Sequence, residues 1–380
     1  MHPTNTIHLK NFSDLGITGA FIKALEEINI ITPTEIQEKA IPILIAKETD
    51  FIGQAQTGTG KTAAYGLPIL QAINPDKPEI QALILSPTRE LGQQIAKQLF
   101  KFTKYIPKKI FIESVYGGPN IEEQIRSLRR PTHIVVATPG RLIDLLERRA
   151  IDLTSIKTLV LDEADEMLSM GFRKDLDSIL KHTAGKRHTW LFSATMPAGI
   201  KAIISSYMSS KAIRFEVNRN EIVNKDIEHK FLICSRLEKP EALFQFLKTQ
   251  GAGRGLVFCR TKIEAQAVTK RLQAKKINAD ALQGDMLQKE RDKVMRAFKN
   301  GNLQILVATD LAARGIDVKE LAFVVHYQLP EKTEYYTHRS GRTGRAGNKG
   351  FSLSLITPRE HDKMKEIIKE LGIKAKEINR

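Results

Sequence analysis

Short runs of apolar residues recur along the chain, and each runs into a polar or glycine-rich turn that precedes a helix-like pattern. Runs of this kind begin at residues 82, 133, 158 and 190 in the first half and at residues 255, 304, 322 and 350 in the second. Nearly continuous apolar strands that alternate with helices are typical of a parallel sheet covered on both faces. The pattern therefore predicts an α/β fold that occurs twice, in two tandem domains.

The residues with unusual chemistry follow these apolar runs, and the stretch LVLDEADEML at residues 159–168 is the most unusual. Its buried-type strand ends in a cluster of acids that begins with Asp162 and Glu163. Crowded carboxylates repel one another and raise each other's pKa. Because ligands of open α/β sheets bind at the carboxyl ends of the strands, a bound cation would make this crowding tolerable.

A glycine-rich turn earlier in the chain supplies the partner for these acids. The sequence GQAQTGTGKT follows the apolar residues at 51–52 and leads into a helical pattern. Glycines let a backbone approach phosphate, and a helix N-terminus offers amide groups and a positive dipole. Lys61 would reach the outer phosphates and Thr62 would place its hydroxyl on Mg²⁺. The generic pattern wants glycine at position 55, where this chain has Ala55, so a plain glycine-rich turn is the alternative.

If the glycine-rich turn binds phosphate, Asp162 and Glu163 can be given catalytic roles. Asp162 would hold the Mg²⁺ that bridges the nucleotide phosphates. Glu163 would orient and deprotonate the attacking water. The alternative is an ordinary acidic first turn of a helix, since Asp and Glu are favourable there.

Composition narrows the class of partner. The chain has 380 residues, 42% of them hydrophobic, and a net charge of +16. Residues 1–217 hold 27 basic and 23 acidic side chains and the remainder holds 32 and 20, so the basic excess lies mainly in the second part. A polyanion such as nucleic acid fits this charge, although a well-charged soluble surface would also produce it. Cys234 and Cys259 have no ligand-like spacing, and no apolar signal or membrane-spanning run is present, which predicts a cytoplasmic protein.

These motifs together resemble the DEAD-box ATP-dependent RNA helicases. In that family the phosphate loop begins AQTGTGKT, as at residues 55–62, so Ala55 is its usual form. The resemblance extends along nearly the whole chain in family order, through TPTEIQ at 32, PTRELGQQ at 87, GG at 117, TPGR at 138, DEAD at 162, SATMP at 193, LVFCRT at 256, QGDMLQKERDKVMRAF at 283, ATDLAARGIDV at 308 and HRSGRTGRAG at 338. Gln283, Asn29 and the segment HYQLP at 326–330 depart from the common pattern, and none of them is a catalytic position.

The resemblance implies a role for each matching residue. Gln37 reads the adenine edge and Phe12 stacks on the ring, unless Phe12 is only a hydrophobic staple. Arg342 and Arg345 act as arginine fingers, with an RNA-phosphate patch as the alternative. The nucleotide-binding set is Phe12, Gln37, Gly58, Thr59, Gly60, Lys61, Thr62 and Asp317, the last of these on the ribose. Ser193, Thr195, Asp165 and His338 couple the ATP state to closure of the domains.

The RNA-facing residues are expected to grip the backbone and not the bases. In the first domain these are Thr88, Arg89, Gly117, Gly118, Thr138, Gly140 and Arg141. In the second they are Arg260, Gln288, Arg291, Thr309 and Asp310. Taken singly, each could equally be a solvated loop residue or a helix cap.

The resemblance thus implies two RecA-like domains, at residues 1–217 and 226–380, joined by a linker at 218–225. ATP, Mg²⁺ and RNA would bind in the cleft between the domains of a monomer, and closure would locally separate a short duplex or remodel an RNA–protein complex. A non-unwinding RNA clamp and a DNA translocase are the alternatives. The physiological RNA, the subfamily and the protein partners cannot be inferred from these residues.

Overall fold

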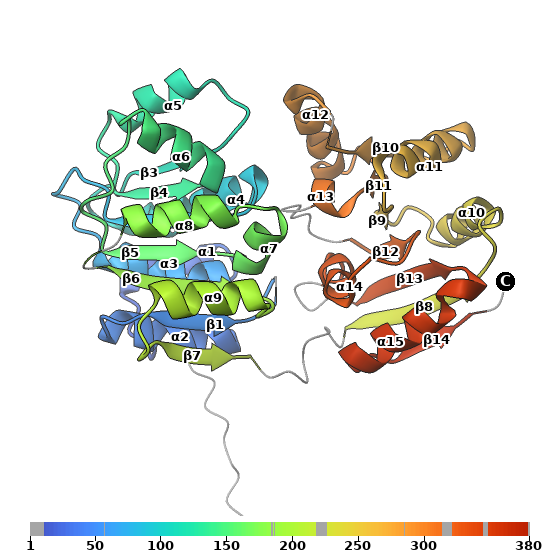
Figure 1. The fold of residues 1–380 in the computed structure, drawn as a ribbon, viewed down its shortest axis with the longest axis horizontal. Helices are drawn as coiled ribbons and strands as arrows, with labels where there is room; N and C mark the ends of the chain where they lie inside the picture. Colours follow the sequence, from blue (N-terminus) through green and yellow to red (C-terminus); the bar gives the residue numbers. More distant parts are fainter. Residues whose placement is uncertain are drawn as a thin grey trace, which may run out of the picture. The chain divides into compact units, whose positions relative to one another are not determined.

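A computed structural model describes residues 11–56, 58–183, 185, 187–217, 226–284, 286–313, 321–344 and 349–378. The chain divides into two compact units, Met1–Val217 and Asn218–Arg380, and each is considered by itself (Figure 1). The predicted linker, 218–225, lies outside the described residues.

The first unit is built on a seven-stranded sheet whose recorded pairings are all parallel. In spatial order the strands are β3 (Ile112–Val115), β4 (Ile134–Ala137), β2 (Ala82–Leu85), β5 (Thr158–Leu161), β6 (His188–Ser193), β1 (Phe51–Gln54) and β7 (Ile213–Glu216). The central strands β2 and β4 are buried at every position, as their apolar runs predict. Such a strand cannot stand with one face in water, so both faces of the sheet need a layer of helices.

The two helical layers of the first unit form separate hydrophobic clusters with the sheet. One face is covered by α1 (Gly19–Glu27), α2 (Glu35–Ala46), α3 (Lys61–Ala72) and α4 (Arg89–Phe102), which a short 3₁₀ helix, η1 (Thr103–Tyr105), follows. The other is covered by α5 (Ile121–Leu128), α6 (Pro139–Glu147), α7 (Ala164–Ser169), α8 (Arg173–His182) and α9 (Ala198–Tyr207). Each fully buried Leu or Ile in these clusters contributes about 2 kcal/mol to stability.

The second unit repeats this architecture. Its parallel sheet runs β10 (Ala279–Leu282), β11 (Ile305–Ala308), β9 (Gly255–Phe258), β12 (Phe323–His326), β13 (Gly350–Ile356), β8 (Ile227–Ile233) and β14 (Ala375–Glu377). One face packs on α10 (Lys239–Thr249) and α11 (Lys262–Ala274). The other packs on α12 (Gln288–Lys299), α13 (Asp310–Ala313), α14 (Thr333–Ser340) and α15 (His361–Leu371), the last preceded by η3 (Pro358–Glu360).

Numbered from the first strand of each unit, both sheets have the order 3-4-2-5-6-1-7. The predicted α/β fold with two parallel sheets is confirmed. The correspondence reaches single residues: Thr88 after β2 and Thr261 after β9 both cap the next helix, accepting the backbone N–H three residues on at 3.2 Å. Within the described ranges, no helix is long and apolar enough to cross a membrane.

Candidate active site

The phosphate loop joins β1 to α3 at the carboxyl edge of the first sheet. Gly60 has a left-handed backbone, with φ of 88°, and a Cβ there would lie 2.3 Å from the Gln37 amide nitrogen. Only glycine fits that position. Lys61 opens α3, is 6% exposed, and donates from Nζ to the Ala55 carbonyl at 2.9 Å. The lysine charge is thus held inside the loop by a neutral acceptor, which an anionic ligand can replace.

Gln37 ties the start of α2 to this loop. Its Oε1 accepts the backbone N–H of Thr34 at 2.9 Å, and its Nε2 donates to the Gly60 carbonyl at 3.0 Å. Thr34 adds a bond from its hydroxyl to the Thr59 carbonyl at 2.7 Å. Phe12 is 3% exposed and belongs to the core cluster, the arrangement expected of the packing alternative. Its adenine-stacking role stays a prediction.

The acidic turn follows β5 and lies across from the phosphate loop. Asp162 is 2% exposed, and its Oδ2 accepts the hydroxyl of Tyr65 from α3 at 2.9 Å. Burial raises the pKa of Asp162 to about 6, the charge of Lys61 opposes this rise, and Glu163 adds to it. Tyr65 is fully buried, and the sequence reasoning missed it because Tyr65 and Asp162 are far apart in the chain.

Glu163 has a strained backbone. Its φ of 51° and ψ of 50° are left-handed, which is uncommon for a residue that is not glycine. Its N–H donates to Asp162 Oδ1 at 3.0 Å, and its side chain is half-buried at the start of α7. Asp162 is buried and Glu163 is half-buried, so the two neighbouring carboxylates lie in different surroundings.

Asp165 joins the acidic turn to the turn after β6. Its Oδ2 accepts both the N–H and the hydroxyl of Thr195, at 2.9 and 2.7 Å. Its own N–H donates to Ser193 Oγ at 3.2 Å, and Ser193 Oγ donates to the Thr195 carbonyl at 2.7 Å. Three residues that were predicted to couple the ATP state to closure are therefore brought together in one closed network.

The predicted RNA-facing residues of the first unit lie on neighbouring turns. Gly117 and Gly140 have open space where a Cβ would stand, and Gly118 has a left-handed φ of 106°. Arg89 lies over the Tyr116 ring, with 4.8 Å from Cζ to the ring centroid. Thr138 is the residue before α6, where it leaves the helix N-terminus open to a ligand.

Arg141 makes hydrogen bonds within the first unit, and its RNA contact stays a prediction. Its guanidinium donates to Gln124 Oε1 at 2.9 Å and to the Pro119 carbonyl at 3.1 Å, and its side chain is 9% exposed. Gln124 in turn donates to the Tyr116 carbonyl at 3.1 Å. Arg141 thus holds the segment around the Gly117–Gly118 turn in place.

In the second unit, several predicted RNA-facing side chains also make internal bonds. Arg260 donates to the Leu329 carbonyl at 3.1 Å, Arg291 to the Ala312 carbonyl at 2.8 Å, and Gln288 to Asp292 at 2.8 Å. Thr309 accepts the Ala312 N–H at 3.4 Å. These bonds fix the turns after β9 and β11.

Asp310 is paired with a residue that the sequence reasoning did not single out. Its carboxylate accepts Nε and Nη2 of Arg339 at 2.5 and 2.6 Å. Arg339 is 2% exposed, donates to the Gln328 carbonyl at 2.8 Å, and lies over the Phe258 ring. This bidentate pair joins α14 to α13, directly before the arginine-finger segment.

Arg342 follows α14, and its Nε donates to the His338 carbonyl at 3.2 Å. His338 lies in the last turn of α14, with Tyr335 as a ring neighbour. Arg345 and Asp317 lie outside the described residues. The roles of all four stay predictions.

A buried polar cluster beneath α14 was also missed. His326 Nε2 lies 3.1 Å from Ser340 Oγ and 3.2 Å from Ser352 Oγ, and its ring stacks on Tyr336 at 4.3 Å. His229 Nδ1 lies 3.2 Å from the Tyr336 hydroxyl. Burial lowers the pKa of His229 to about 4 and that of His326 well below its ordinary range. Both imidazoles are therefore neutral at neutral pH.

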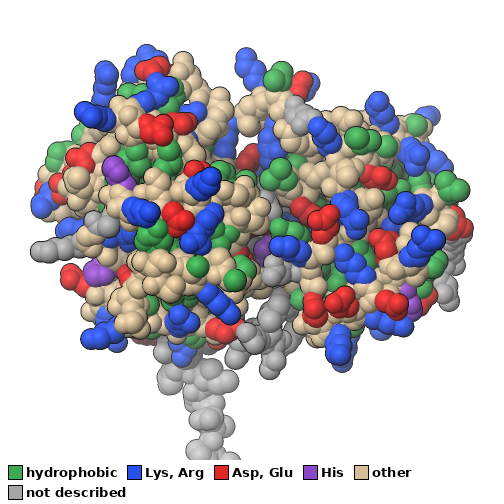
Figure 2. Space-filling view, in the orientation of Figure 1, with side chains coloured by type: hydrophobic (Ala, Val, Ile, Leu, Met, Phe, Trp, Pro, Cys, Tyr) green, Lys and Arg blue, Asp and Glu red, His purple; other side chains and the backbone are tan. Residues whose placement is uncertain are grey.

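The surface charge is mixed on the face that Figure 2 shows. Lys and Arg side chains lie over both units, with Asp and Glu among them. On that face the basic side chains form no single patch.

Comparisons with known proteins bear on the whole chain. The sequence model of the DEAD/DEAH box helicases matches residues 34–203, and that of the helicase conserved C-terminal domain matches residues 238–347. An ATP-dependent RNA helicase CshA of Limosilactobacillus reuteri is 44% identical over 94% of this chain and 71% of its own length. The DEAD-box ATP-dependent RNA helicase CshA of Bacillus licheniformis is 41% identical over 94% and 72%.

Solved structures are similar over nearly all of the chain as well. Dbp5 of S. cerevisiae bound to RNA and ADP BeF3 has a TM-score of 0.89 at 29% identity, covering 97% of this chain and 95% of that one. The DEAD-box helicase Mss116 bound to ssRNA and UDP-BeF has a TM-score of 0.89 at 29% identity, covering 98% and 81%.

Proposed function

The chain belongs to the DEAD-box ATP-dependent RNA helicases, and on that premise we propose which of its residues carry out each step. Membership makes it an enzyme that couples ATP hydrolysis to the binding and unwinding of RNA. The proposal concerns the division of work among Lys61, the acidic turn and the turn after β6.

Lys61 and the loop amides hold the nucleotide phosphates. The Nζ of Lys61 is already desolvated and is bonded only to a backbone carbonyl in the described structure, so exchanging that carbonyl for a phosphate oxygen strengthens the bond. Gln37 lies one hydrogen bond from Gly60, which supports a role in linking recognition of the base to the shape of the loop.

The donor set fits Mg²⁺. Asp162 is a buried carboxylate at a strand end, and burial raises its pKa to about 6. Thr62 is the second residue of the helix that begins at Lys61. The described residues contain no group of three or more acidic, His or Cys ligands, as expected for an ion held by few protein groups together with phosphates. When bound, Mg²⁺ would neutralise charge on the phosphates, with Thr62 and Asp162 as its protein ligands.

Glu163 is the base for the attacking water in this proposal. Its left-handed backbone costs about 1 kcal/mol, and such strain clusters at active sites. Arg342 and Arg345 of the second unit would stabilise the charge that develops on the transferred phosphoryl group.

The observation that carries the proposal is the bidentate contact between Asp165 and Thr195. It ties the turn after β6 to the helix turn that directly follows the catalytic acids in the chain. A movement of the acidic turn on nucleotide binding would therefore shift Thr195 through its two bonds to Asp165. The RNA-facing set named above, from Thr88 to Asp310, would hold the RNA backbone, with Arg141 and the Asp310–Arg339 pair positioning the turns. The two buried free thiols, Cys234 and Cys259, support a reducing, cytoplasmic location.

The test uses two neighbouring variants in a single-turnover assay on a short RNA duplex. Glu163→Gln keeps the size of the side chain and loses its basicity, so MgATP should bind, one strand should be released per binding event, and the protein should stay on the other strand. Asp162→Asn should weaken the metal and prevent both steps. Hydrolysis by Glu163→Gln at the wild-type rate would refute the choice of base.

The same assay separates the alternatives. If Glu163→Gln locks onto RNA and neither it nor the wild type displaces a strand, the protein is an RNA clamp. If DNA stimulates hydrolysis as well as RNA does, the translocase alternative wins.

A further inference from the structure

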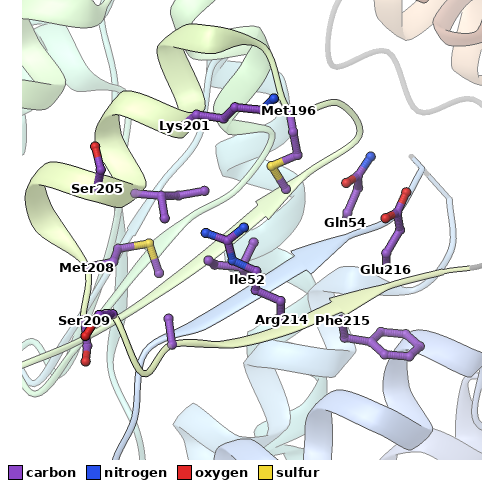
Figure 3. Close-up of a pocket in the computed structure, with 13 residues that line it drawn as sticks. Ile52, Gln54, Met196, Lys201, Ser205, Met208, Ser209, Arg214, Phe215 and Glu216 are labelled. Atoms are coloured by element: carbon purple, nitrogen blue, oxygen red, sulfur yellow. The ribbon is translucent and has the colours of Figure 1, made fainter.

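A groove lies beside the edge strand β7 of the first unit (Figure 3). Its volume of about 690 Å³ is within the range of ligand sites. Residues from β1, α9 and β7 line it, among them Ile52, Met196, Lys201, Ile204, Met208 and Arg214. The proposed function uses none of these residues.

The groove combines an apolar floor with a basic rim. Ile52, Ile204 and Met208 are at most 9% exposed. Lys201 and Arg214 are exposed, and within the described structure neither side chain has a hydrogen bond or ion pair. Figure 3 shows the Arg214 guanidinium over the middle of the groove and Gln54 and Glu216 together at one end. An acidic group of a ligand is therefore favoured near Arg214 and disfavoured near Glu216.

The backbone of β7 offers a second kind of contact. The N–H groups of Ile213 and Val217 donate to β1, to the carbonyls of Asp50 and Gln54, at 3.0 Å each. Backbone groups alternate in direction along a strand, so the N–H and C=O of Arg214 point away from β1. Among the described residues no bond to either group is formed. Such an edge is a template for another strand.

We propose that this groove docks an extended, acidic segment of a partner protein, which adds to β7 as a further strand. Alternate side chains of that segment would face Arg214 and Lys201 on the α9 side. The others would lie beside Ile213 and Phe215, which pack with the α1–α4 layer on the opposite face. An alternation of acidic and apolar residues matches both faces at once. RNA fits less well, because its backbone has no strand-like spacing of donors and acceptors and would meet Glu216.

The test measures binding of a fluorescein-labelled octapeptide, Asp-Val repeated four times, to the full chain by fluorescence anisotropy. The Asp-Val peptide should bind with Kd below about 1 mM and at least about tenfold more tightly than a Lys-Val peptide. Arg214→Glu should weaken Asp-Val binding at least about tenfold. Lys211→Glu makes the same charge change at an exposed site outside the groove and should cost less than about twofold. An Asp-Val peptide N-methylated at alternate residues should lose binding, because it cannot pair with β7.

Several results would overturn the proposal. Equal losses in Arg214→Glu and Lys211→Glu would mean non-specific attraction, and unchanged binding of the N-methylated peptide would exclude strand addition. An RNA oligomer that displaces the peptide and itself depends on Arg214 would make the groove an RNA surface. Absence of Asp-Val binding at 1 mM, about the weakest affinity expected of such a contact, would also refute it. Wild-type ATP hydrolysis by Arg214→Glu shows that the variant is folded, and none of these results bears on the roles of Lys61 or Glu163.

Discussion

The two units have the same strand order but treat one equivalent lysine in opposite ways. Lys61 opens α3 after β1, and Lys239 opens α10 after β8, and both of these strands are sixth in their sheets. Lys61 follows a glycine turn and bonds to a neutral carbonyl. Lys239 follows no such turn, donates to the Tyr327 carbonyl at 3.0 Å, and lies 3.4 Å from Glu360. Both units thus have a lysine at the start of the helix that follows the sixth strand. Because of the turn before it, only Lys61 is available to a phosphate.

The units also differ in the direction in which burial shifts the pKa of a titratable side chain. In the first, burial raises the pKa of Asp162 to about 6, so the folded state binds a proton more readily than the unfolded chain. In the second, burial lowers the pKa of His229 to about 4, so the folded state binds a proton less readily. Between these values and the ordinary ones, acidification favours folding at Asp162 and opposes it at His229.

Replacing the two lysines should give the largest contrast. Lys61→Ala should lower RNA-stimulated ATP hydrolysis at least about a thousandfold, because no other buried cation of the loop can meet the outer phosphates. Lys239→Ala should keep hydrolysis and lower the free energy of unfolding by about 2 kcal/mol, since it leaves the buried Tyr327 carbonyl without its side-chain donor and removes the cation beside Glu360. Steady-state ATPase assays and urea denaturation measure the two effects. Equal loss of hydrolysis in both variants would erase the contrast.

In the first unit, replacing Asp162 should change the stability by an amount that depends on pH. Asp162→Asn removes a buried carboxylate that in the folded state is ionised above about pH 6 and protonated below it, whereas in the unfolded chain it is protonated only below about pH 4. Without nucleotide, the variant should therefore be about 2–3 kcal/mol more stable than wild type at pH 8 and equally stable near pH 4. Trp190, the one tryptophan, lies in the first unit and reports its unfolding. An unchanged or lower stability at pH 8 would contradict the burial argument.

In the second unit, acid should act in the opposite direction. Unfolded histidine gains a proton below about pH 6.5, whereas His229 resists protonation until about pH 4. Burial of His229 alone should cost the second unit about 2 kcal/mol of stability between pH 7 and pH 5, and buried His326 adds to this loss. His229→Gln, which can still meet the Tyr336 hydroxyl, should make the loss smaller by about that amount. Circular dichroism in urea at both pH values measures it, and an equal slope in wild type and variant would assign the acid response to other groups.

Gln37→Ala gives the smallest effect and separates two roles for one amide. If the amide reads adenine, ATP should weaken about tenfold while GTP changes little, so that discrimination falls. If it only supports Gly60, both nucleotides should weaken together. Competition binding of ATP and GTP to the variant distinguishes these results, and retention of the wild-type preference for ATP would move base recognition to another residue.

Much of this arrangement was predictable from the sequence, because it depends on short segments of consecutive residues. Apolar runs that end in glycine or acidic turns predicted the parallel sheets and placed Lys61, Asp162 and Ser193 at strand ends. The bonds between elements were not predictable in the same way. Tyr65 meets Asp162, and Arg339 meets Asp310, only because strand order brings together helices and turns that are distant in the chain.

The sequence pattern also did not predict which polar side chains are buried. Arg141, Asp310 and Arg260 were expected to face RNA because they match family positions, and that stays a prediction. Their internal bonds depend on neighbouring turns, which the sequence pattern does not reveal. His326 belongs to a segment that departs from the family pattern, and that departure was the one signal of the buried cluster beneath α14. The edge of β7 left no signal, because its alternation reads as an ordinary half-buried strand.

The central claim is that the chain has one phosphate-binding loop, that of the first unit, and that nucleotide binding depends on its Lys61. Isothermal titration of MgATP into the full chain and into the Lys61→Ala and Lys239→Ala variants tests it most directly. The account predicts one site per chain in the wild type, one site of unchanged affinity in Lys239→Ala, and no measurable binding in Lys61→Ala. Two sites in the wild type, or binding that is lost in Lys239→Ala and kept in Lys61→Ala, would contradict it.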